Sequence, residues 1–494
     1  MDYVNLPIPI LSVSIFLPIV GIFFMMIFAN HENIERENIY AKYIGIFSAC
    51  LTLLASCYMM VCFDYNQHGY QFEEHYKLAP SLGLEYNLAV DGISLLFIVL
   101  TALLIPICFF TVACNLKEKV REFFICFLLL ESFVIACFAS SNLLLFYIFF
   151  EAMLIPMYII IGCFGGENRV YAAFKFFLYT FLGSVFFLIG LITIYIKIGS
   201  FDMLYLMSHT KDIANLVPHW VWVGIFISMA VKVPMVPFHT WLPDAHVQAP
   251  TSGSVILAGI LLKVGGYGMI RVLIQIMPDL SRYYAEYVIY MSIFAIIYGS
   301  YVAMTQIDMK KMIAYSSVAH MGYVTAGIFS MNNTGMEGAL LQMLSHGLIS
   351  SGLFLVVGML YERIHTKEIA AYGGVATRMP FLATFFMILV MGSVGLPGTS
   401  GFVAEFISLV GIFKYNMYFA IIAAFGVVLG AIYMLSLYKK VMFGVITNPK
   451  IQKIEDLGLH EILVLSVLCI FTIIIGIQPE YILSIFRLGL SRIL

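Results

Sequence analysis

Seven ionisable side chains lie inside long apolar stretches of the sequence, where charged groups are costly. They are Glu131, Glu151, Lys232, Lys263, His320, His346 and Glu405. At the centre of a bilayer such a group costs at least about 2.5–3.5 kcal/mol, so it needs a partner, water or a function. Carboxylates, amines and imidazoles can bind and release protons near neutral pH when their surroundings adjust their proton affinity. The set therefore predicts a proton relay across a membrane.

The same residues allow a second interpretation, in which static ion pairs fix the packing of helices. Glu131 is the weakest member of the relay and could be a supporting charge. Lys175 lies near the start of an apolar stretch, and we expect its side chain to extend to the membrane surface. His239 and His246, with Asp244 between them, could suggest a metal site, but no further carboxylate or thiolate completes one. We expect these three side chains to support the surrounding helix through hydrogen bonds.

The composition requires a membrane around these residues. Of the 494 residues, 62% are hydrophobic and 11% are charged, whereas ordinary soluble proteins carry about 25% charged residues. The mean hydropathy is +0.97. The formal net charge is −2, so the chain lacks the basic stripe of a nucleic-acid-binding protein. We therefore expect an all-α polytopic membrane protein that binds no nucleic acid.

The sequence contains no motif for a cofactor or a metal. Its nine cysteines include no CxxC pair and no Cys/His spacing that suits zinc or an iron–sulfur cluster. Most are expected to be small buried apolar residues. Gly265-Gly266-Tyr267-Gly268 has no preceding strand, and the run from Gly395 to Gly401 lacks the lysine of a phosphate-binding loop. We expect neither NADH nor ATP to bind here.

Fourteen apolar stretches bounded by charged or turn residues are long enough to span a bilayer. The expected spans are 8–28, 40–62, 92–113, 122–139, 142–163, 172–196, 219–247, 252–275, 285–304, 312–330, 337–360, 380–411, 417–440 and 461–484. Between the second and third spans, 64–91 is a long polar loop. Its turn residues and short apolar pieces could form a small hairpin that caps one face.

Glycine and proline interrupt two of the expected spans. The seventh contains the Lys232 to Pro237 run KVPMVP, and the twelfth contains the Gly395 to Gly401 run GLPGTSG. Such breaks are tolerated at membrane depth where the backbone lines a cavity, although bending for packing alone is the alternative. The breaks lie five spans apart, as two inverted five-helix repeats require, and such pairs mark transport sites. The expected regions are helices 1–3 (1–120), a first repeat of helices 4–8 (121–275), a second, inverted repeat of helices 9–13 (285–440) and helix 14 (441–494).

The distribution of basic residues predicts the orientation in the membrane. Lys and Arg are retained on the side from which the chain inserts. They are more frequent after odd-numbered spans, where Lys310, Lys311 and Lys367 are found, and Arg271 belongs to the smaller number assigned to the other side. Both termini are therefore expected to face the bacterial periplasm or the mitochondrial intermembrane space.

Four long motifs carry a resemblance to a known family. They are VKVPMVPFHTWLPDAHVQAPTSGSVILAGILLKVGGYGMIR (231–271), IAYSSVAHMGYV (313–324), MLSHGLISSGLFLVVGMLYERIHTKEIAAYGG (343–374) and GLPGTSGFVAEF (395–406). They resemble the antiporter-like, proton-translocating membrane subunits of NADH-ubiquinone oxidoreductase, or respiratory complex I. Within that family they are most similar to the branch called chain 4, or chain M in bacteria.

The resemblance implies which residues form the relay. The family's relay residues fall on Glu151, Lys232, Lys263, His320, His346 and Glu405. At Glu405 the antiporter-like sister subunits commonly carry lysine, which favours chain 4. As a hypothesis, Glu151 stabilises Lys232 as a cation when the two approach, and Lys232 passes its proton on when they separate. Lys263 receives the proton, His320 and water pass it across the centre, and Glu405 releases it to the outer side.

The energy for pumping must come from outside this chain. Moving one charge against 100 mV requires about 2.3 kcal/mol, and no group in this sequence can supply it. The resemblance places NADH, FMN, the iron–sulfur clusters and ubiquinone on partner subunits, with no cofactor on this chain. The expected partners are the other complex I membrane subunits, including the antiporter-like sister chains, and lipid.

Two other functions and two locations stay open at this stage. A subunit of a multi-subunit sodium/proton antiporter would share the fold and much of the relay, and a packing subunit would hold inert charges. The 42 Phe and 30 Tyr residues suit an A+T-rich organellar gene, and the N-terminus resembles no targeting segment. We therefore expect a multi-pass protein of the mitochondrial inner membrane, with the bacterial plasma membrane as the alternative.

Overall fold

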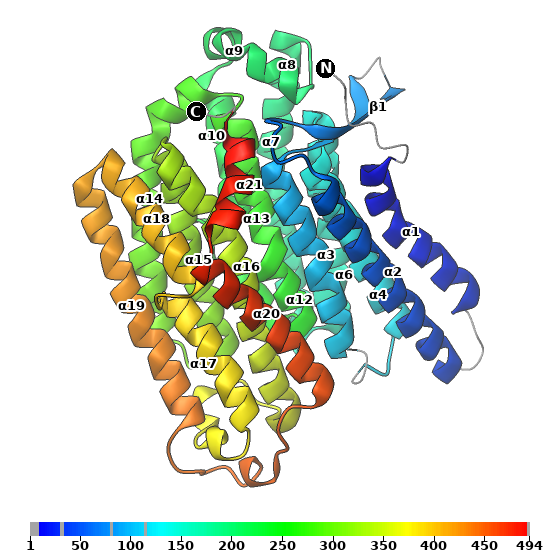
Figure 1. Ribbon diagram of the computed structural model, residues 1–494, viewed down its shortest axis with the longest axis vertical. Helices are drawn as coiled ribbons and strands as arrows, with labels where there is room; N and C mark the ends of the chain where they lie inside the picture. Colours follow the sequence, from blue (N-terminus) through cyan, green and yellow to red (C-terminus); the bar gives the residue numbers. More distant parts are fainter. Residues whose placement is uncertain (1–8, 30–33, 80–82, 113–115, 492–494) are drawn as a thin grey trace. The chain divides into compact units, whose positions relative to one another are not determined.

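The computed structural model describes residues 9–29, 34–79, 83–112 and 116–491 (Figure 1). The first residue of the expected span 8–28, the last residue of 92–113, and Cys114 lie outside this part of the chain. The chain divides into two compact units, each built from several segments. Unit 1 comprises 1–232, 263–283 and 485–494, and unit 2 comprises 233–262 and 284–484.

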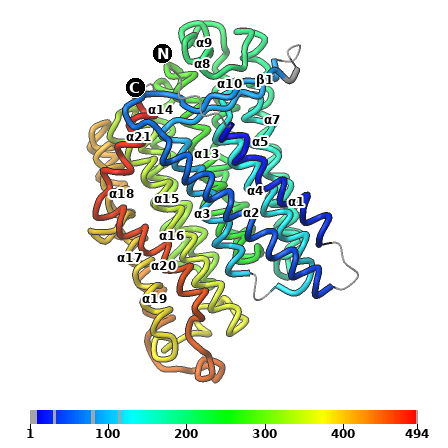
Figure 2. The backbone as a smooth tube through the Cα atoms, turned by 45° about the vertical axis from the view of Figure 1, so that its right-hand side comes forward, coloured from blue at the N-terminus to red at the C-terminus, as the bar shows by residue number. Residues whose placement is uncertain are grey.

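Unit 1 is a helical bundle with a small hairpin at one end (Figures 1 and 2). Its elements are α1 (Ile10–Phe28), α2 (Ile34–Cys62), β1 (Gln71–Ala79), β2 (Leu84–Val90), α3 (Gly92–Val112), α4 (Val120–Ala139), α5 (Leu143–Ala152), α6 (Leu154–Phe164), α7 (Arg169–Ile198), α8 (Met203–Ser208), α9 (Thr210–Leu216), α10 (His219–Lys232), most of α13 (Leu262–Gly268) and the π-helical segment η3 (Met269–Ile274). The short helices α8 and α9 lie at the same end as the hairpin in both views.

The hairpin confirms the expectation for the polar loop 64–91. Strands β1 and β2 pair in antiparallel register, with Tyr76 opposite Tyr86. Glu74 accepts a hydrogen bond from the backbone N–H of Leu11 at 3.0 Å and another from the hydroxyl of Ser12. Because backbone N–H groups at a helix N-terminus lack intrahelical partners and favour negative charge, Glu74 fastens the hairpin to the start of α1.

Unit 2 is also a bundle of helices. Its elements are α11 (Trp241–Gln248), α12 (Thr251–Ile256), the π-helical segment η2 (Leu257–Leu261), most of α14 (Pro278–Met304), α15 (Met309–Phe329), α16 (Asn333–Ile364), the 3₁₀ turns η4 (Ile369–Ala371) and η5 (Val375–Thr377), α17 (Pro380–Val394), α18 (Ser400–Tyr415), α19 (Met417–Met442), η6 (Ile451–Lys453), α20 (Leu459–Ile477) and the start of α21 (Glu480–Leu490). Side chains cap α15, α16 and α19 at their starts, through Asp308, Asn332 and Asn416 respectively.

The expectation of an all-α, multi-pass membrane protein is confirmed. In the described part of the chain, eleven helices are long and apolar enough to cross a membrane, or twelve when the bent pair α9 and α10 counts as one span. The three expected spans without a qualifying straight helix are 219–247, 312–330 and 380–411. In the first and third, the chain forms two shorter helices. In the second, α15 is continuous but too polar to qualify.

Two interruptions account for the shorter helices. In 219–247, α10 ends at Lys232 and α11 begins only at Trp241, as the prolines between them require. In 380–411, α17 ends at Val394 and α18 begins at Ser400. Gly395 and Gly398 adopt positive φ values of 81° and 93°, which glycine accepts without strain. Each interruption leaves backbone groups beside one of the candidate site residues.

Candidate functional site

Lys232 and Glu151 come together in unit 1. Lys232 is the last residue of α10 and is 3% exposed. Its Nζ donates to the backbone carbonyl of Phe150 at 3.4 Å and lies 4.4 Å from the centre of the Phe150 ring. Glu151 is the next residue of α5, directly after the Phe150 carbonyl that Lys232 binds. The ammonium is thus held by a carbonyl and an aromatic face one residue away from Glu151.

Lys263 and Glu131 are also buried in unit 1. Lys263 is completely buried in α13, which continues into the π-helical segment η3. Glu131 is completely buried in α4, and neither of its carboxylate oxygens has a hydrogen-bond partner in the described residues. Its neighbour Ser132 donates to the carbonyl of Ile15 on α1. Among the residues that the structure describes, Glu131 therefore forms no ion pair that would fix α4 to its neighbours.

His320 and Glu405 form the centre of a second cluster, in unit 2. Nδ1 of His320 on α15 lies 2.7 Å from Oε1 of Glu405 on α18. The other ring nitrogen, Nε2, lies 3.2 Å from the hydroxyl of Ser393 near the end of α17. Gln342 on α16 donates to the same Glu405 oxygen at 3.3 Å. Four helices thus surround one imidazole–carboxylate contact across which a proton can be shared.

His346 extends this second cluster. Its ring centre lies 5.7 Å from that of His320, and it is 5% exposed. A cavity is lined by His320, His346 and Glu405 together with Ser316 and Ser393. These side chains offer hydrogen-bond partners to a water molecule, and the space of about 10 Å³ is the size of one water. The structure therefore brings three of the sequence-predicted residues together around one small cavity.

His239, Asp244 and His246 lie in unit 2 but do not line this cavity. The His239 ring centre lies 5.4 Å from that of Tyr298, and His246 stacks on Phe354 at 4.4 Å. Asp244 is half-buried on α11. No group of three potential ligands that could hold a metal ion is present in the described residues. The two histidines pack against aromatic rings around the interrupted helix.

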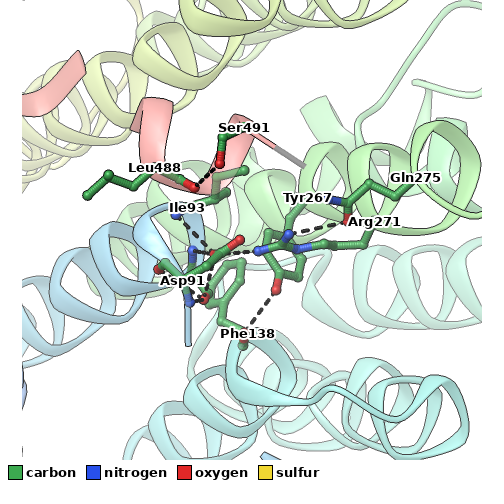
Figure 3. A network of polar contacts seen from close by, with 9 residues as sticks. Asp91, Ile93, Phe138, Tyr267, Arg271, Gln275, Leu488 and Ser491 are labelled. Carbon is green, nitrogen blue, oxygen red and sulfur yellow. Dashed lines mark hydrogen bonds and ion pairs between the residues drawn. The ribbon is translucent and has the colours of Figure 1, made fainter. Parts of the chain in front are cut away.

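Unit 1 contains a buried ion pair that was not predicted from the sequence. Arg271 in η3 is 1% exposed and pairs with Asp91, the residue before α3 (Figure 3). Asp91 also accepts from the backbone amides of Ile93 and Ser94, and Gln275 binds the other arm of Arg271 at 3.3 Å. The assignment of Arg271 to a loop was wrong. Its position inside the apolar stretch 252–275 indicates that the side chain is buried. A buried guanidinium requires an acidic partner, so the sequence could have predicted an ion pair at Arg271.

Comparisons with known proteins agree with this fold. Residues 140–430 match the family described as "NADH:quinone oxidoreductase/Mrp antiporter, TM". The chain therefore belongs to the NADH:quinone oxidoreductase/Mrp antiporter family of membrane proteins.

Named relatives define the branch within this family. The chain is 55% identical to NADH-quinone oxidoreductase subunit M of Rickettsia conorii, over 99% of both chains. It is 42% identical to NADH-ubiquinone oxidoreductase chain 4 of Marchantia polymorpha, over 98% of this chain and 96% of the relative. Both are names of the branch that the sequence motifs resemble.

Solved structures show the same fold. A chain of respiratory complex I from Thermus thermophilus with bound NADH matches with a TM-score of 0.87 and 28% identity, over 98% of both chains. A chain of the Mrp complex from Dietzia sp. matches with a TM-score of 0.86 and 19% identity, over 98% of this chain and 97% of that one. At 19% identity, the match to the Mrp complex chain shows only that the two chains share a fold.

Proposed function

We propose that this chain is a proton-translocating membrane subunit of respiratory complex I, the NADH-quinone oxidoreductase. The observation that carries this proposal is the buried His320–Glu405 contact at 2.7 Å, beside the interruption between α17 and α18. An imidazole next to a carboxylate and a hydroxyl can receive a proton on one nitrogen and release one from the other. The relatives named subunit M and chain 4 support the assignment to complex I.

The relay begins at the first cluster, with Glu151 and Lys232. In our proposal Lys232 is protonated while Glu151 is near, and it releases its proton when the carboxylate moves away. The present contact of Lys232 with the Phe150 carbonyl supports a lysine that can exchange partners, because a carbonyl holds an ammonium less strongly than a carboxylate does. Lys263 is the proposed receiver of this proton.

The second cluster completes the proposed relay. His320 and His346 pass the proton through the polar cavity, and Glu405 releases it toward the outer side. Glu131, His239 and Asp244 have supporting roles in this scheme. The cavity supports the proposal because one water molecule in it could bridge the rings of His320 and His346, whose centres lie 5.7 Å apart.

The proposed architecture has fourteen spans in two inverted five-helix repeats. Helices 4–8 (121–275) form the first repeat and helices 9–13 (285–440) form the second, with helices 7 and 12 broken. The interruptions after Lys232 and after Val394 support this arrangement. The three expected spans that fail a simple test of length and apolarity are those that contain Lys232, His320 and Glu405.

Electron transfer takes place on other subunits in this proposal. NADH, FMN, iron–sulfur clusters and ubiquinone are assigned to partner subunits, and this chain contributes proton transfer driven from them. Moving one proton against 100 mV requires about 2.3 kcal/mol, which those subunits must deliver by a change in conformation or charge. The proposed neighbours in the membrane are the antiporter-like sister chains and lipid.

The alternative function is a subunit of a multi-subunit sodium/proton antiporter. Its support is the shared family and the fold of the Mrp complex chain. Identity of 19% to that chain, against 55% to a subunit M over nearly the whole length, favours complex I.

The proposed location is the plasma membrane of a bacterium. The bacterial relative from Rickettsia conorii is 55% identical, whereas the plant chain 4 from Marchantia polymorpha is 42% identical. This difference favours the plasma membrane over the mitochondrial inner membrane that the aromatic composition suggested.

The test of the proposed function replaces Lys232. In membrane vesicles that contain the assembled complex, Lys232→Ala should abolish proton uptake driven by NADH oxidation, with or without loss of quinone reduction. Lys175→Ala is the matched control, since Lys175 is a half-buried span lysine that lies over the Tyr171 ring. Full oxidation with full pumping in an assembled Lys232→Ala complex would overturn the proposed relay.

A further inference from the structure

Two lysines of unit 2 bind the same helix end. Nζ of Lys310 on α15 donates to the carbonyl of Ala249 at 2.9 Å, and Nζ of Lys367 donates to the carbonyl of Val247 at 2.6 Å. These carbonyls belong to the end of α11, the short helix that follows the first interruption. The last carbonyls of a helix lack intrahelical partners and carry a partial negative charge, so they attract cations.

The two lysines differ in their access to water. Lys310 is 2% exposed, whereas Lys367 is half-buried in the segment after α16. Burial lowers the pKa of Lys367, and Asp308 partly opposes this effect. Neither lysine forms an ion pair within 4 Å with any residue that the structure describes. The titratable groups around them are Asp308 at the start of α15, Tyr361, Tyr372, and Asp244 and His246 on α11.

Capping alone does not account for Lys310. An ammonium has three N–H donors, and here one carbonyl is its hydrogen-bond acceptor. Burying a charged group without a carboxylate costs several kcal/mol, whereas glycine or water caps a helix end at little cost. A buried amine that is so weakly compensated can exist in the neutral as well as the charged form, as a proton carrier must.

The position of Lys310 connects it with the second cluster. Ser317 and His320 follow Lys310 on α15 by seven and ten residues. Residues at these spacings lie toward the same side of a helix. Ser316 on the same helix lines the cavity that contains His320. The excess of basic residues after odd-numbered spans places 305–311 and 365–379 on the inner side of the membrane. The lysine pair thus lies where protons must enter from inside.

We propose that Lys367 and Lys310 form the proton-intake site of unit 2. Lys367 takes a proton from water on the inner side and gives it to the neutral amine of Lys310. The Lys310 ammonium then releases a proton to a water molecule that leads along α15 to His320, and the amine is neutral again. Each step moves one proton and leaves no other product. The inference rests on the proposed function and adds a second point of entry, from which protons reach His320 without passing through Lys232 and Lys263.

Two substitutions at Lys310 separate proton transfer from capping. Arginine keeps the charge and can donate to the Ala249 carbonyl, but it does not release its proton. Lys310→Arg should therefore slow the proton translocation that this chain carries out by about a hundredfold, as Lys310→Met should, and so lower the protons pumped per NADH in a complex that assembles normally. Lys311→Arg, on the adjacent half-exposed lysine, should pump as the unmodified complex does. A normal proton-to-electron ratio in Lys310→Arg would show that the lysine only caps α11, and would overturn the proposal.

A substitution at Lys367 supplies a second test that does not depend on a buried site. Lys367→Met should slow pumping at neutral inner pH, and acidification of the inner side should restore it, because protons can then load Lys310 directly. An unchanged pH profile would contradict the proposal. If Lys232→Ala abolishes pumping while both intake variants pump normally, the relay stands and only the intake site is refuted. If Lys232→Ala pumps normally, the proposed function itself fails.

Discussion

The two ring nitrogens of His320 face different chemistry. One lies 2.7 Å from a carboxylate oxygen of Glu405, and the other lies 3.2 Å from the hydroxyl of Ser393. Because a neutral imidazole donates from one nitrogen and accepts at the other, a proton that arrives on one side can leave from the other. Between arrival and release the His320 ring carries a proton on both nitrogens, and the Glu405 carboxylate stabilises this charged form. The direction of transfer then depends on which neighbour next offers or accepts a proton.

Replacing Glu405 by glutamine tests this arrangement. Glu405→Gln keeps the shape and a hydrogen bond to His320 but removes the group that binds a proton. We expect the complex to assemble and the proton translocation that this chain carries out to slow by about a hundredfold, which lowers the protons translocated per NADH oxidised. Glu286→Gln, an exposed glutamate of unit 2, is the control. Undiminished pumping by Glu405→Gln would remove Glu405 from the relay.

The Asp91–Arg271 pair predicts a pH-dependent contribution to stability. Burial acts to raise the pKa of Asp91, but Arg271 and Ser94 outweigh it and hold the pKa below its usual value. The stabilisation should be complete above the unfolded pKa of about 4, and should be lost as the pH falls through the folded value. Asp91→Asn should cost about 3–5 kcal/mol, because it leaves Arg271 as an unpaired buried cation.

The thermal inactivation of the purified protein between pH 3 and pH 7 measures this contribution. The unmodified protein should lose stability on acidification, and Asp91→Asn should be less stable but flatter across the acid range. Asp279→Asn removes an exposed carboxylate that lies 3.8 Å from Arg282, and it should change little. Equal stability of Asp91→Asn and the unmodified protein would show that the pair contributes nothing.

At the level of helices, most of the architecture could be predicted from hydrophobic runs. The eleven qualifying helices each coincide with an expected span, because about 20 apolar residues suffice to define one. Proline and glycine indicated both interruptions. The short helices α8 and α9 were not predicted, because segments of six or seven residues carry too little periodicity.

Within the site, single residues were easier to predict than their contacts. Buried acids, lysines and histidines stand out among apolar residues, so His320 and Glu405 were found. Their partners Gln342 and Ser393 carry no charge and resemble ordinary helix residues in the sequence. The Asp91–Arg271 pair joins residues 180 positions apart, and one sequence holds no information on such pairing.

Helices α16 and α18 contact each other so closely that one added methyl group at their contact should disturb their packing. A Cβ added to Gly338 on α16 would overlap the backbone of Ser408 on α18. Gly338→Ala should therefore separate helices that carry Gln342 and Glu405, one turn or less away, and weaken their 3.3 Å hydrogen bond. We expect lower thermal stability by about 1–3 kcal/mol, together with reduced pumping.

Gly430→Ala is the control for this substitution. An added Cβ there would have the Tyr433 hydroxyl at 3.8 Å as its nearest neighbour, which is an ordinary contact. Gly430→Ala should leave stability unchanged or slightly raise it, because alanine favours a helix more than glycine does. Similar losses in both variants would indicate that helix propensity or general packing, rather than the α16–α18 contact, determines the result.

At the scale of the whole molecule, orientation in the membrane follows from the basic residues. The hairpin follows the second expected span, and the segment 443–458 follows the thirteenth, so they should face opposite sides. Cysteine introduced at Val445, which is 82% exposed, should react with a membrane-impermeant maleimide only from the inner side. Cysteine at His75, in the hairpin, should react only from the outer side. Labelling of both sites from one side would disprove the predicted orientation.

The order in which the segments of unit 1 occur along the chain has a consequence for biosynthesis. The unit 1 segment 485–494 is synthesised after all of unit 2. In the finished protein this segment approaches the start of α3 so closely that a Cβ on Gly92 would overlap the carbonyl of Ile485. The start of α3 therefore completes its packing only after unit 2 has been synthesised. A stop codon introduced before Ile485 should leave α3 open to proteolysis.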